Sequence, residues 1–203
     1  MKKPFQLIGL TGTAGCGKDT VAEFLRDVYA FRPVSLADPI RRGVCEMFGL
    51  SHEYMTDRVL KEQPIHHLCN KSPRQFMQTL GTEWGRNHIC THIWLNIAQR
   101  KIDRDRKLYE RNNSFPDGIV VSDIRLDGEA KWLKDQGGEI WFINRPDNPH
   151  ALTDNDHESE AGVSLEYIDK TITNDSDVDD LYERIALLME CHTEINQPET
   201  EAS

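Results

Sequence analysis

A glycine-rich stretch near the start of the chain, GLTGTAGCGKDT at 9–20, constrains the fold more than any other feature of the sequence. Gly12, Gly17 and Lys18 fit the phosphate-loop pattern G-x-x-x-x-G-K, between a short apolar run and a segment of helical apolar spacing. In such a loop the glycines let the backbone wrap a phosphate, amide N–H groups point inward, and the following helix N-terminus adds partial positive charge. An ordinary glycine-rich turn is the alternative, but the complete pattern in this context predicts a nucleotide phosphate site.

The residue after Lys18 is unusual for such a loop. Asp19 stands where the pattern has a hydroxyl group for magnesium, and Thr20 follows one place late. A carboxylate beside a triphosphate is repelled unless a cation lies between them. Magnesium would reverse that sign, because it prefers carboxylate, water and phosphate oxygens. Asp19 therefore either contributes to a magnesium site or turns away and caps its helix, and the sequence leaves both open.

Apolar spacing predicts strands that alternate with helices along the chain. The expected strands are 5–10, 33–36, 118–121, 139–144 and 171–173, and the expected helices include 18–29 and segments that start near 38, 73 and 178. This alternation predicts a three-layer α/β fold, in which helices cover both faces of a parallel sheet. Ligands of such sheets bind at the carboxyl ends of the strands. The glycine loop, Asp123, Arg145 and Asn174 each follow an expected strand, so we expect them to converge.

A helical region at about 38–116 is expected as an insertion within a single domain of 1–190. Asp38 and Pro39 read as the N-cap and the first residue of one helix. Ser72 and Gln75 form a capping box with proline between them, which predicts another helix start. Along that second helix, apolar residues spaced by four predict a buried face, and polar residues an opposite face: Phe76, Leu80 and Trp84 against Arg74, Gln78 and Gly81.

Three segments lack apolar periodicity. The first, 103–118, is highly charged and is predicted to loop out. The second, about 145–165, is rich in Pro, Asp, Asn and His and is predicted to be a functional loop such as a lid. The tail at 191–203 is predicted to be disordered.

Arginines and one strand-end carboxylate suggest the reaction class. Phosphoryl transfer needs cations around the moving group, and a guanidinium offers a two-pronged fork. Any single arginine is more often a solvated surface charge, but a set near helix starts and strand ends favours chemistry. Asp123 is either a metal-side aspartate or only a helix cap, and the arginine two residues later favours the former. The candidate arginines are Arg41, Arg74, Arg86, Arg125 and Arg145.

Composition excludes several other classes. With 24 Lys and Arg against 34 Asp and Glu, the net charge of −10 argues against a basic stripe for nucleic acid. Five cysteines without C-x-x-C spacing suit a reducing cytoplasm. No stretch approaches the roughly 18 apolar residues of a membrane span. We therefore expect a cytoplasmic protein without nucleic-acid or membrane partners, and the sequence leaves a homodimer open.

Several segments together resemble phage-type deoxynucleoside monophosphate kinases. The loop ending "GKDT" is similar to the form found there, so Asp19 is usual in that family. Outside the loop, "RQFMQTLGTE" at 74–83 resembles the family's R-x-x-x-Q-x-L-G-T segment and is the most specific match. "LADPIR" at 36–41, "VVSDIR" at 120–125, "INRP" at 143–146, "HESEAG" at 157–162 and "TITND" at 171–175 are similar as well. The segment at 49–71 has no clear counterpart.

The resemblance implies a P-loop NTPase fold with a helical acceptor-binding insertion and a lid loop. It implies transfer of the γ-phosphoryl group of ATP to a deoxynucleoside monophosphate (dNMP), giving the diphosphate, with Mg²⁺. Lys18, Asp123 and Arg145 would be catalytic. Asp19, Thr20 and Asp123 would face the metal, although for Asp123 a place on the acceptor side stays open. The ATP-binding set would be Gly12, Ala14, Gly15, Cys16, Gly17, Lys18, Asp19 and Thr20, with Asn174 near the adenine edge. The acceptor-binding set would be Asp38, Arg41, Arg74, Gln78, Arg86 and Arg125.

Two other readings stay open at this point. Animal phosphomevalonate kinases share a "GKD" loop and an "SDxR" strand end, so a kinase of another small phosphorylated metabolite, such as a coenzyme A precursor, is one alternative. A nucleotide-gated module that hydrolyses ATP without an acceptor is the other. The R-x-x-x-Q-x-L-G-T and "TITND" segments favour the nucleotide kinase.

Overall fold

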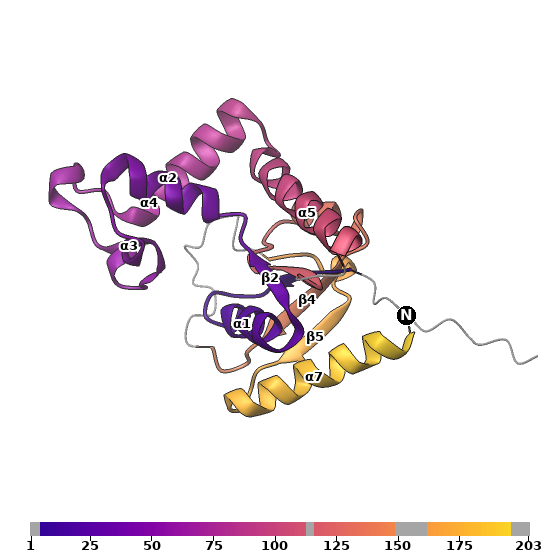
Figure 1. The fold of residues 1–203 in the computed structure, drawn as a ribbon. Coiled ribbons are helices and arrows are strands. Elements are labelled where there is room, and N and C mark those ends of the chain that lie inside the picture. Colours follow the sequence, from indigo (N-terminus) through magenta and orange to yellow (C-terminus); the bar gives the residue numbers. More distant parts are fainter. Residues whose placement is uncertain (1–4, 113–115, 149–161, 196–203) are drawn as a thin grey trace, which may run out of the picture. The chain divides into compact units, whose positions relative to one another are not determined.

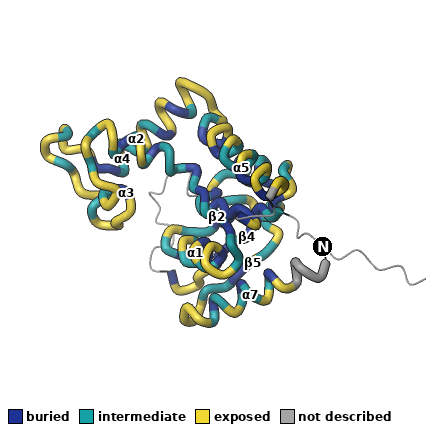
Figure 2. Tube along the Cα trace, viewed as in Figure 1, coloured by how far each residue is buried: buried dark blue, intermediate teal, exposed yellow. Residues whose placement is uncertain are grey.

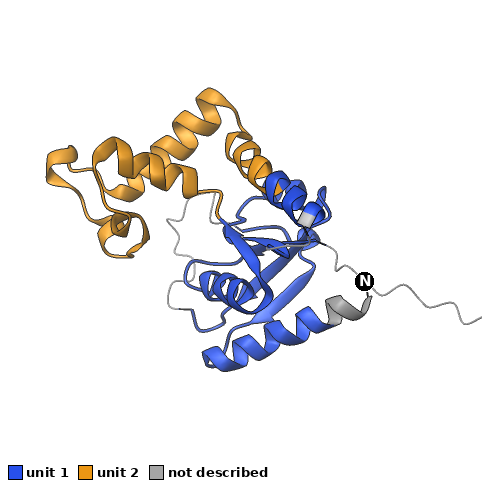
Figure 3. Ribbon diagram, in the orientation of Figure 1, with its two compact units in different colours: residues 1–34, 103–203 blue, residues 35–102 orange. Residues whose placement is uncertain are grey.

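The computed structural model describes residues 5–112, 116–148 and 162–195 of the 203-residue chain. The chain forms two compact units (Figure 3). Unit 1 comprises residues 1–34 and 103–203, and unit 2 comprises residues 35–102. The second unit begins close to the start expected for the helical insertion, at 38, and ends before the expected 116.

Unit 1 is built on a five-stranded sheet in which every neighbouring pair of strands is parallel (Figure 1). The strands lie in the order β2-β3-β1-β4-β5. The three central strands are mostly apolar runs because both faces of a parallel sheet are buried there, whereas the edge strands β2 and β5 are only partly buried. Their bounds are β1 Gln6–Thr11, β2 Phe31–Val34, β3 Gly118–Val121, β4 Glu139–Asn144 and β5 Lys170–Thr173.

Helices cover both faces of the sheet, so the expected three-layer α/β architecture is confirmed. Ile8 and Leu10 of β1 belong to the buried cluster that α1 (Lys18–Tyr29) and α7 (Val178–Ile195) share with the sheet. Gly9 lies between them and faces the opposite side of the sheet, where a Cβ on it would contact Leu133 of α6 (Asp127–Lys134). The strands at the centre of the unit are accordingly largely buried, while the outer helix faces are exposed (Figure 2).

Several predicted elements occur where the apolar spacing placed them. The helix at 18–29 and the strands at 118–121 and 139–144 have the expected bounds. The second strand lies two residues earlier than expected, at Phe31–Val34. Val28, expected on the buried face of α1, is 58% exposed. Within unit 1 the glycine loop, Asp123, Arg145 and Asn174 follow β1, β3, β4 and β5, which places them at the same edge of the sheet, as predicted.

Unit 2 is helical and has its own apolar core around Ile40, Val44, Met55 and Trp94. The capping box is confirmed, because Gln75 N–H donates to Ser72 Oγ and Ser72 N–H donates to Gln75 Oε1. Asp38 was expected as the N-cap, but the N-cap is Ala37 and Asp38 is the first residue of the helix. The elements are α2 Asp38–Phe48, α3 Glu53–Thr56, the 3₁₀ turns Leu60–Glu62 and His66–Leu68, α4 Pro73–Gln78 and the π-helix η3 Thr79–Ile89. Helix α5 (Ile93–Asn112) begins in this unit.

The buried face predicted for the segment after Ser72 is wrong at its far end. Trp84 is 50% exposed, whereas Gly81 and Gly85 are buried. From Thr79 onward the helix is a π-helix, in which hydrogen bonds run from i to i+5, so the α-helical period on which the prediction rested does not apply there. Trp94, rather than Trp84, is the buried tryptophan of this region, and its Nε1 donates to the Gly81 carbonyl at 2.8 Å.

The charged segment at 103–118 was expected to loop out, and this prediction is wrong for most of its length. Helix α5 continues to Asn112. Ile102 and Tyr109 are buried at helical spacing, and Asp105 between them is fully buried and pairs with Arg32 at 2.7 Å. Most of the charged side chains in this segment therefore lie on the solvent-exposed face of an amphipathic helix, α5.

The C-terminal segment also contains more helix than expected. Helix α7 runs to Ile195, five residues into the predicted tail, and residues 196–203 lie outside the described part. Leu181, Ile185 and Met189 anchor α7, and further turns of a nucleated helix form at low cost. None of the described helices is long and apolar enough to cross a lipid bilayer.

Two helix glycines should respond in opposite ways to alanine. A Cβ at Gly85 would lie 2.5 Å from Trp94 Cζ2, whereas a Cβ at Gly128 of α6 would meet nothing within 4 Å. Gly85→Ala should lower the free energy of unfolding by about 2 kcal/mol through overpacking. Gly128→Ala should raise it by ~0.5 kcal/mol by reducing the freedom of the unfolded chain. Urea denaturation of both variants measures this, and equal effects would contradict the packing described for the π-helix.

Candidate nucleotide site

The phosphate loop depends on backbone conformations that favour glycine. Gly12, Gly15 and Gly17 have φ angles of 136°, 76° and 109°. A Cβ at Gly12 would lie 2.4 Å from the carbonyl oxygen of Ile143 on β4, so the loop starts where two backbones approach too closely for a side chain. Gly17 is the N-cap of α1, whose first N–H groups have no acceptor within the helix. Such a helix start attracts anions.

Five consecutive loop carbonyls, from residue 12 to residue 16, each accept a hydrogen bond from a side chain. The Lys18 ammonium donates to the Gly12 and Thr13 carbonyls at 2.7 and 2.8 Å. The three that follow bind donors from beyond β4 and β5: Asn148 Nδ2 to Ala14 at 2.8 Å, Arg145 Nη1 to Gly15 at 3.3 Å, and Asn174 Nδ2 to Cys16 at 2.8 Å. The oxygens that would repel a phosphate are thereby engaged elsewhere.

Sequence reasoning identified Lys18, Arg145 and Asn174 but missed Asn148. Asn148 is 7% exposed and also donates to Thr13 Oγ1 at 2.8 Å. It lies in the predicted lid at 145–165, and residues 149–161 of that segment are outside the described part. Asn174, expected near the adenine edge, contacts the loop backbone, and a Cβ on Gly17 would lie 2.7 Å from its Nδ2.

The remaining predicted residues of unit 1 lie around the loop and at the end of β3. Asp19 is exposed in the first turn of α1, where a carboxylate interacts favourably with the helix dipole, and Thr20 beside it is half-buried. Cys16 is fully buried, with its Sγ 3.7 Å from Lys18 Nζ. Asp123 is half-buried and Arg125 is exposed.

The loop that carries Asp123 and Arg125 is fixed by an acidic residue that sequence reasoning also missed. The buried carboxylate of Glu129 accepts hydrogen bonds from the backbone N–H groups of Arg125 and Leu126, at 2.8 and 3.2 Å. A glutamate three residues after a helix boundary is the signal that could have found it.

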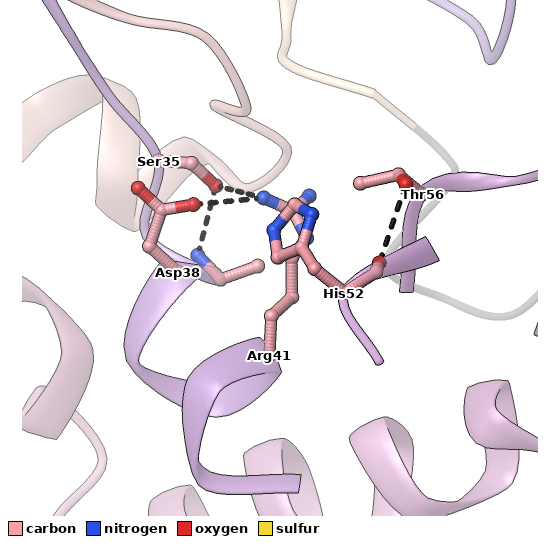
Figure 4. Close-up of polar contacts among 6 residues, drawn as sticks. Ser35, Asp38, Arg41, His52 and Thr56 are labelled. Atoms are coloured by element: carbon pink, nitrogen blue, oxygen red, sulfur yellow. Dashed lines mark hydrogen bonds and ion pairs between the residues drawn. The ribbon is translucent and has the colours of Figure 1, made fainter. Parts of the chain in front are cut away.

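In unit 2, Arg41 is oriented by neighbours at the start of α2 (Figure 4). Its Nη1 donates to Ser35 Oγ and to Asp38 Oδ1, both at 3.0 Å. Ser35 Oγ also accepts from the Ala37 N–H at 3.2 Å, so one hydroxyl group holds both the helix start and the guanidinium. The predicted acceptor residues Asp38 and Arg41 are thus brought together as an ion pair with a defined direction.

The other predicted acceptor residues of unit 2 lie on neighbouring helices. Arg74 of α4 pairs through Nε with Glu62. Gln78, at the end of the same helix, is exposed, and Arg86 on the π-helix is half-buried. Arg125, the sixth predicted acceptor residue, belongs to unit 1.

Comparison with known proteins decides the family. Residues 50–185 match the model of the deoxynucleotide monophosphate kinase family. The chain belongs to this family. The match begins after the phosphate loop, so the assignment is independent of the glycine pattern. It also includes the segment 49–71 from residue 50 onward, for which the sequence showed no clear counterpart.

Viral relatives of this chain match it over most of the length of both proteins. A protein of Acanthamoeba polyphaga mimivirus, provisionally named a deoxynucleotide monophosphate kinase, is 29% identical over 94% of this chain and 99% of its own. The deoxynucleoside-5'-monophosphate kinase of Escherichia phage T5 is 25% identical over 84% of this chain and 90% of its own. The deoxynucleotide monophosphate kinase of Enterobacteria phage T4 is 23% identical, over 89% and 97%.

Solved structures confirm the fold class. TT1252 from Thermus thermophilus has a TM-score of 0.50 at 18% identity, covering 93% of this chain and 98% of its own. A sugar kinase from Janibacter sp. HTCC2649 has a TM-score of 0.50 at 14% identity, covering 96% and 100%. Together with the parallel sheet and the phosphate loop, these likenesses show that the chain has the α/β P-loop fold.

The end of the predicted lid is attached to the start of α6. The carboxylate of Asp127 accepts hydrogen bonds from the backbone N–H and the hydroxyl group of Ser164, both at 2.7 Å. These bonds, the backbone one first, hold the pKa of the Asp127 carboxyl below its ordinary value of 3.8. The Asp127–Ser164 contact fixes residue 164 against the start of α6.

The charge of Asp127 should make a pH-dependent contribution to stability. A carboxyl whose pKa is lowered by folding stabilises the fold above its unfolded pKa and loses that contribution as the pH falls through its folded pKa. Asp127→Asn should therefore lower the free energy of unfolding at pH 7, with the difference from wild type shrinking below about pH 3.8. Chemical denaturation between pH 7 and pH 3 measures the difference. A constant difference over that range would contradict the role given to the charged carboxylate.

Proposed function

We propose that this chain transfers the γ-phosphoryl group of ATP to a deoxynucleoside 5'-monophosphate, giving the diphosphate. The observation that carries the proposal is the phosphate loop with its five engaged carbonyls, in a chain that belongs to the deoxynucleotide monophosphate kinase family. The geometry supports a phosphate-binding site, and the names of the relatives supply the acceptor class.

On the donor side, Lys18 is the central group. Its ammonium lies among the loop carbonyls and can exchange those contacts for oxygens of the outer phosphates. Phosphoryl transfer requires little covalent chemistry from the protein, so charge stabilisation and in-line positioning carry the rate. The acceptor phosphate is already anionic, and no strong general base is required.

Magnesium is the metal that the residues fit. Asp19, Thr20 and Asp123 offer oxygen donors in unit 1, where β1 and β3 end side by side. Among the described residues, no three His, Cys, Asp or Glu side chains form a group that could hold an ion. Mg²⁺ suits such a site, because it usually binds through one or two protein ligands, waters and substrate phosphates. When bound, it would neutralise charge on the phosphates.

On the acceptor side, we assign the nucleoside monophosphate to the unit 2 residues Asp38, Arg41, Arg74, Gln78 and Arg86. The pair Asp38–Arg41 supports this assignment, since a guanidinium oriented by a carboxylate and a hydroxyl group is prepared for a bidentate phosphate contact. Arg74, paired with Glu62, is a second oriented guanidinium in the same unit. The expected acceptor role of Arg125, which belongs to unit 1, stays a prediction.

Acceptor-dependent ADP release tests the proposal. Wild-type chain with MgATP should release ADP faster when one or more of the common dNMPs is added, and removal of Mg²⁺ by a chelator should abolish the release. Lys18→Ala should lower the turnover number at least a hundredfold, on the order of the loss of one transition-state donor. Lys131→Ala, which removes an exposed lysine paired with Asp135, is the matched control and should retain wild-type turnover.

ATP turnover that is indifferent to every dNMP would exclude the proposed reaction. Stimulation by a different phosphorylated metabolite would point to another small-molecule kinase. Full activity of Lys18→Ala would remove the phosphate loop from the mechanism.

A further inference from the structure

Asn148 stands out among the buried polar side chains because its two amide protons meet two oxygens of the phosphate loop. It follows β4 by four residues, and its own N–H donates to the Arg145 carbonyl at 3.2 Å, which closes a turn. From this turn its Nδ2 donates to Thr13 Oγ1 and to the Ala14 carbonyl, each at 2.8 Å. A primary amide offers two donors, and both find acceptors here.

We propose that Asn148 is a positioning residue of the phosphate loop. Its amide holds the Thr13 hydroxyl group and the Ala14 carbonyl, so that the loop keeps the conformation in which its N–H groups can bind nucleotide phosphates. This role rests on the nucleotide site of the proposed function, but it concerns a residue outside the set expected from the sequence.

The charges of the donors explain why this residue matters. Among the described residues, four side chains donate to the carbonyls of residues 12–16, and two of them, Lys18 and Arg145, are cationic. A bound polyphosphate attracts both cations, which can then leave the carbonyls. Asn148 and Asn174 are neutral and short, so their contacts persist. When Lys18 releases the Thr13 carbonyl, Asn148 still holds Thr13 through its hydroxyl group.

Loss of this hold should appear as weaker phosphate binding rather than as a slower chemical step. If only a fraction of molecules has the binding conformation, apparent affinity falls by that fraction for every ligand that uses the loop. A dNMP acceptor uses other residues, so its KM should not change. A purely structural defect would instead lower stability without separating these two constants.

Isothermal titration with MgADP tests the proposal on folded chain. Asn148→Ala should weaken MgADP binding about tenfold, since it removes two hydrogen bonds of ordinary net strength. Asn148→Ser, which keeps one donor, should show a smaller loss and serves if the alanine variant folds poorly. Asn96→Ala makes the same chemical change at an exposed position of α5 and should bind MgADP as wild type does.

A double-mutant cycle identifies the contact. Thr13→Val removes the accepting hydroxyl group, and its loss of affinity should be less than additive with that of Asn148→Ala, because both variants break the same bond. Additive losses, or wild-type MgADP binding by Asn148→Ala, would overturn the proposal. Wild-type chain that binds MgADP but phosphorylates no dNMP would contradict the proposed function alone, whereas wild-type chain that binds no MgADP would overturn both.

Discussion

The hydrogen bonds to the backbone carbonyls of residues 12–16 are the interaction on which the phosphate site of unit 1 depends. A turn of this kind cannot form a phosphate site while its carbonyl oxygens face the anion. Each of the five is instead bound by a side chain, and three of those side chains come from beyond β4 and β5. The strand order makes this possible, because β1 lies next to β4, and β5 lies beyond β4.

The same constraint explains the glycines and the position of the lysine. The loop leaves β1 against the backbone of Ile143, where a Cβ at Gly12 would clash, and it enters α1 through Gly17 beside the Asn174 side chain. Lys18, the first residue of α1, reaches back to the start of the loop. The loop is therefore closely packed at both ends, and the Lys18 ammonium binds at its start. All of these contacts lie within unit 1.

Much of unit 1 could be predicted from the sequence because its signals are local. Apolar runs bounded by turn residues defined β3 and β4, and periodicity defined α1. The π-helix could not be predicted in this way, since its hydrogen bonding accompanies the packing of Trp94, from a later helix, on Gly81 and Gly85. The missed part of α5 was hidden by its charges, although Ile102 and Tyr109 already had helical spacing.

The candidate site also contains residues that local sequence signals predict and residues that only tertiary packing reveals. The phosphate loop, Lys18 and the strand-end residues follow from a motif and from topology. Asn148 lies in a segment of polar residues that reads as a loop, and only the folded chain shows that its amide is buried against Thr13 and Ala14. The expected place of Asn174 near the adenine edge stays a prediction, while its contact with the Cys16 carbonyl belongs to the loop.

The most direct test of the central claim is an NMR titration of ¹⁵N-labelled chain with MgADP, in which each backbone amide is followed. If the carbonyls are held by side chains, the loop N–H groups stay available to bind phosphate. The largest chemical-shift changes should then fall on the backbone amides of residues 13–20. Shifts concentrated elsewhere in the chain, with these amides unchanged at saturating MgADP, would contradict the account.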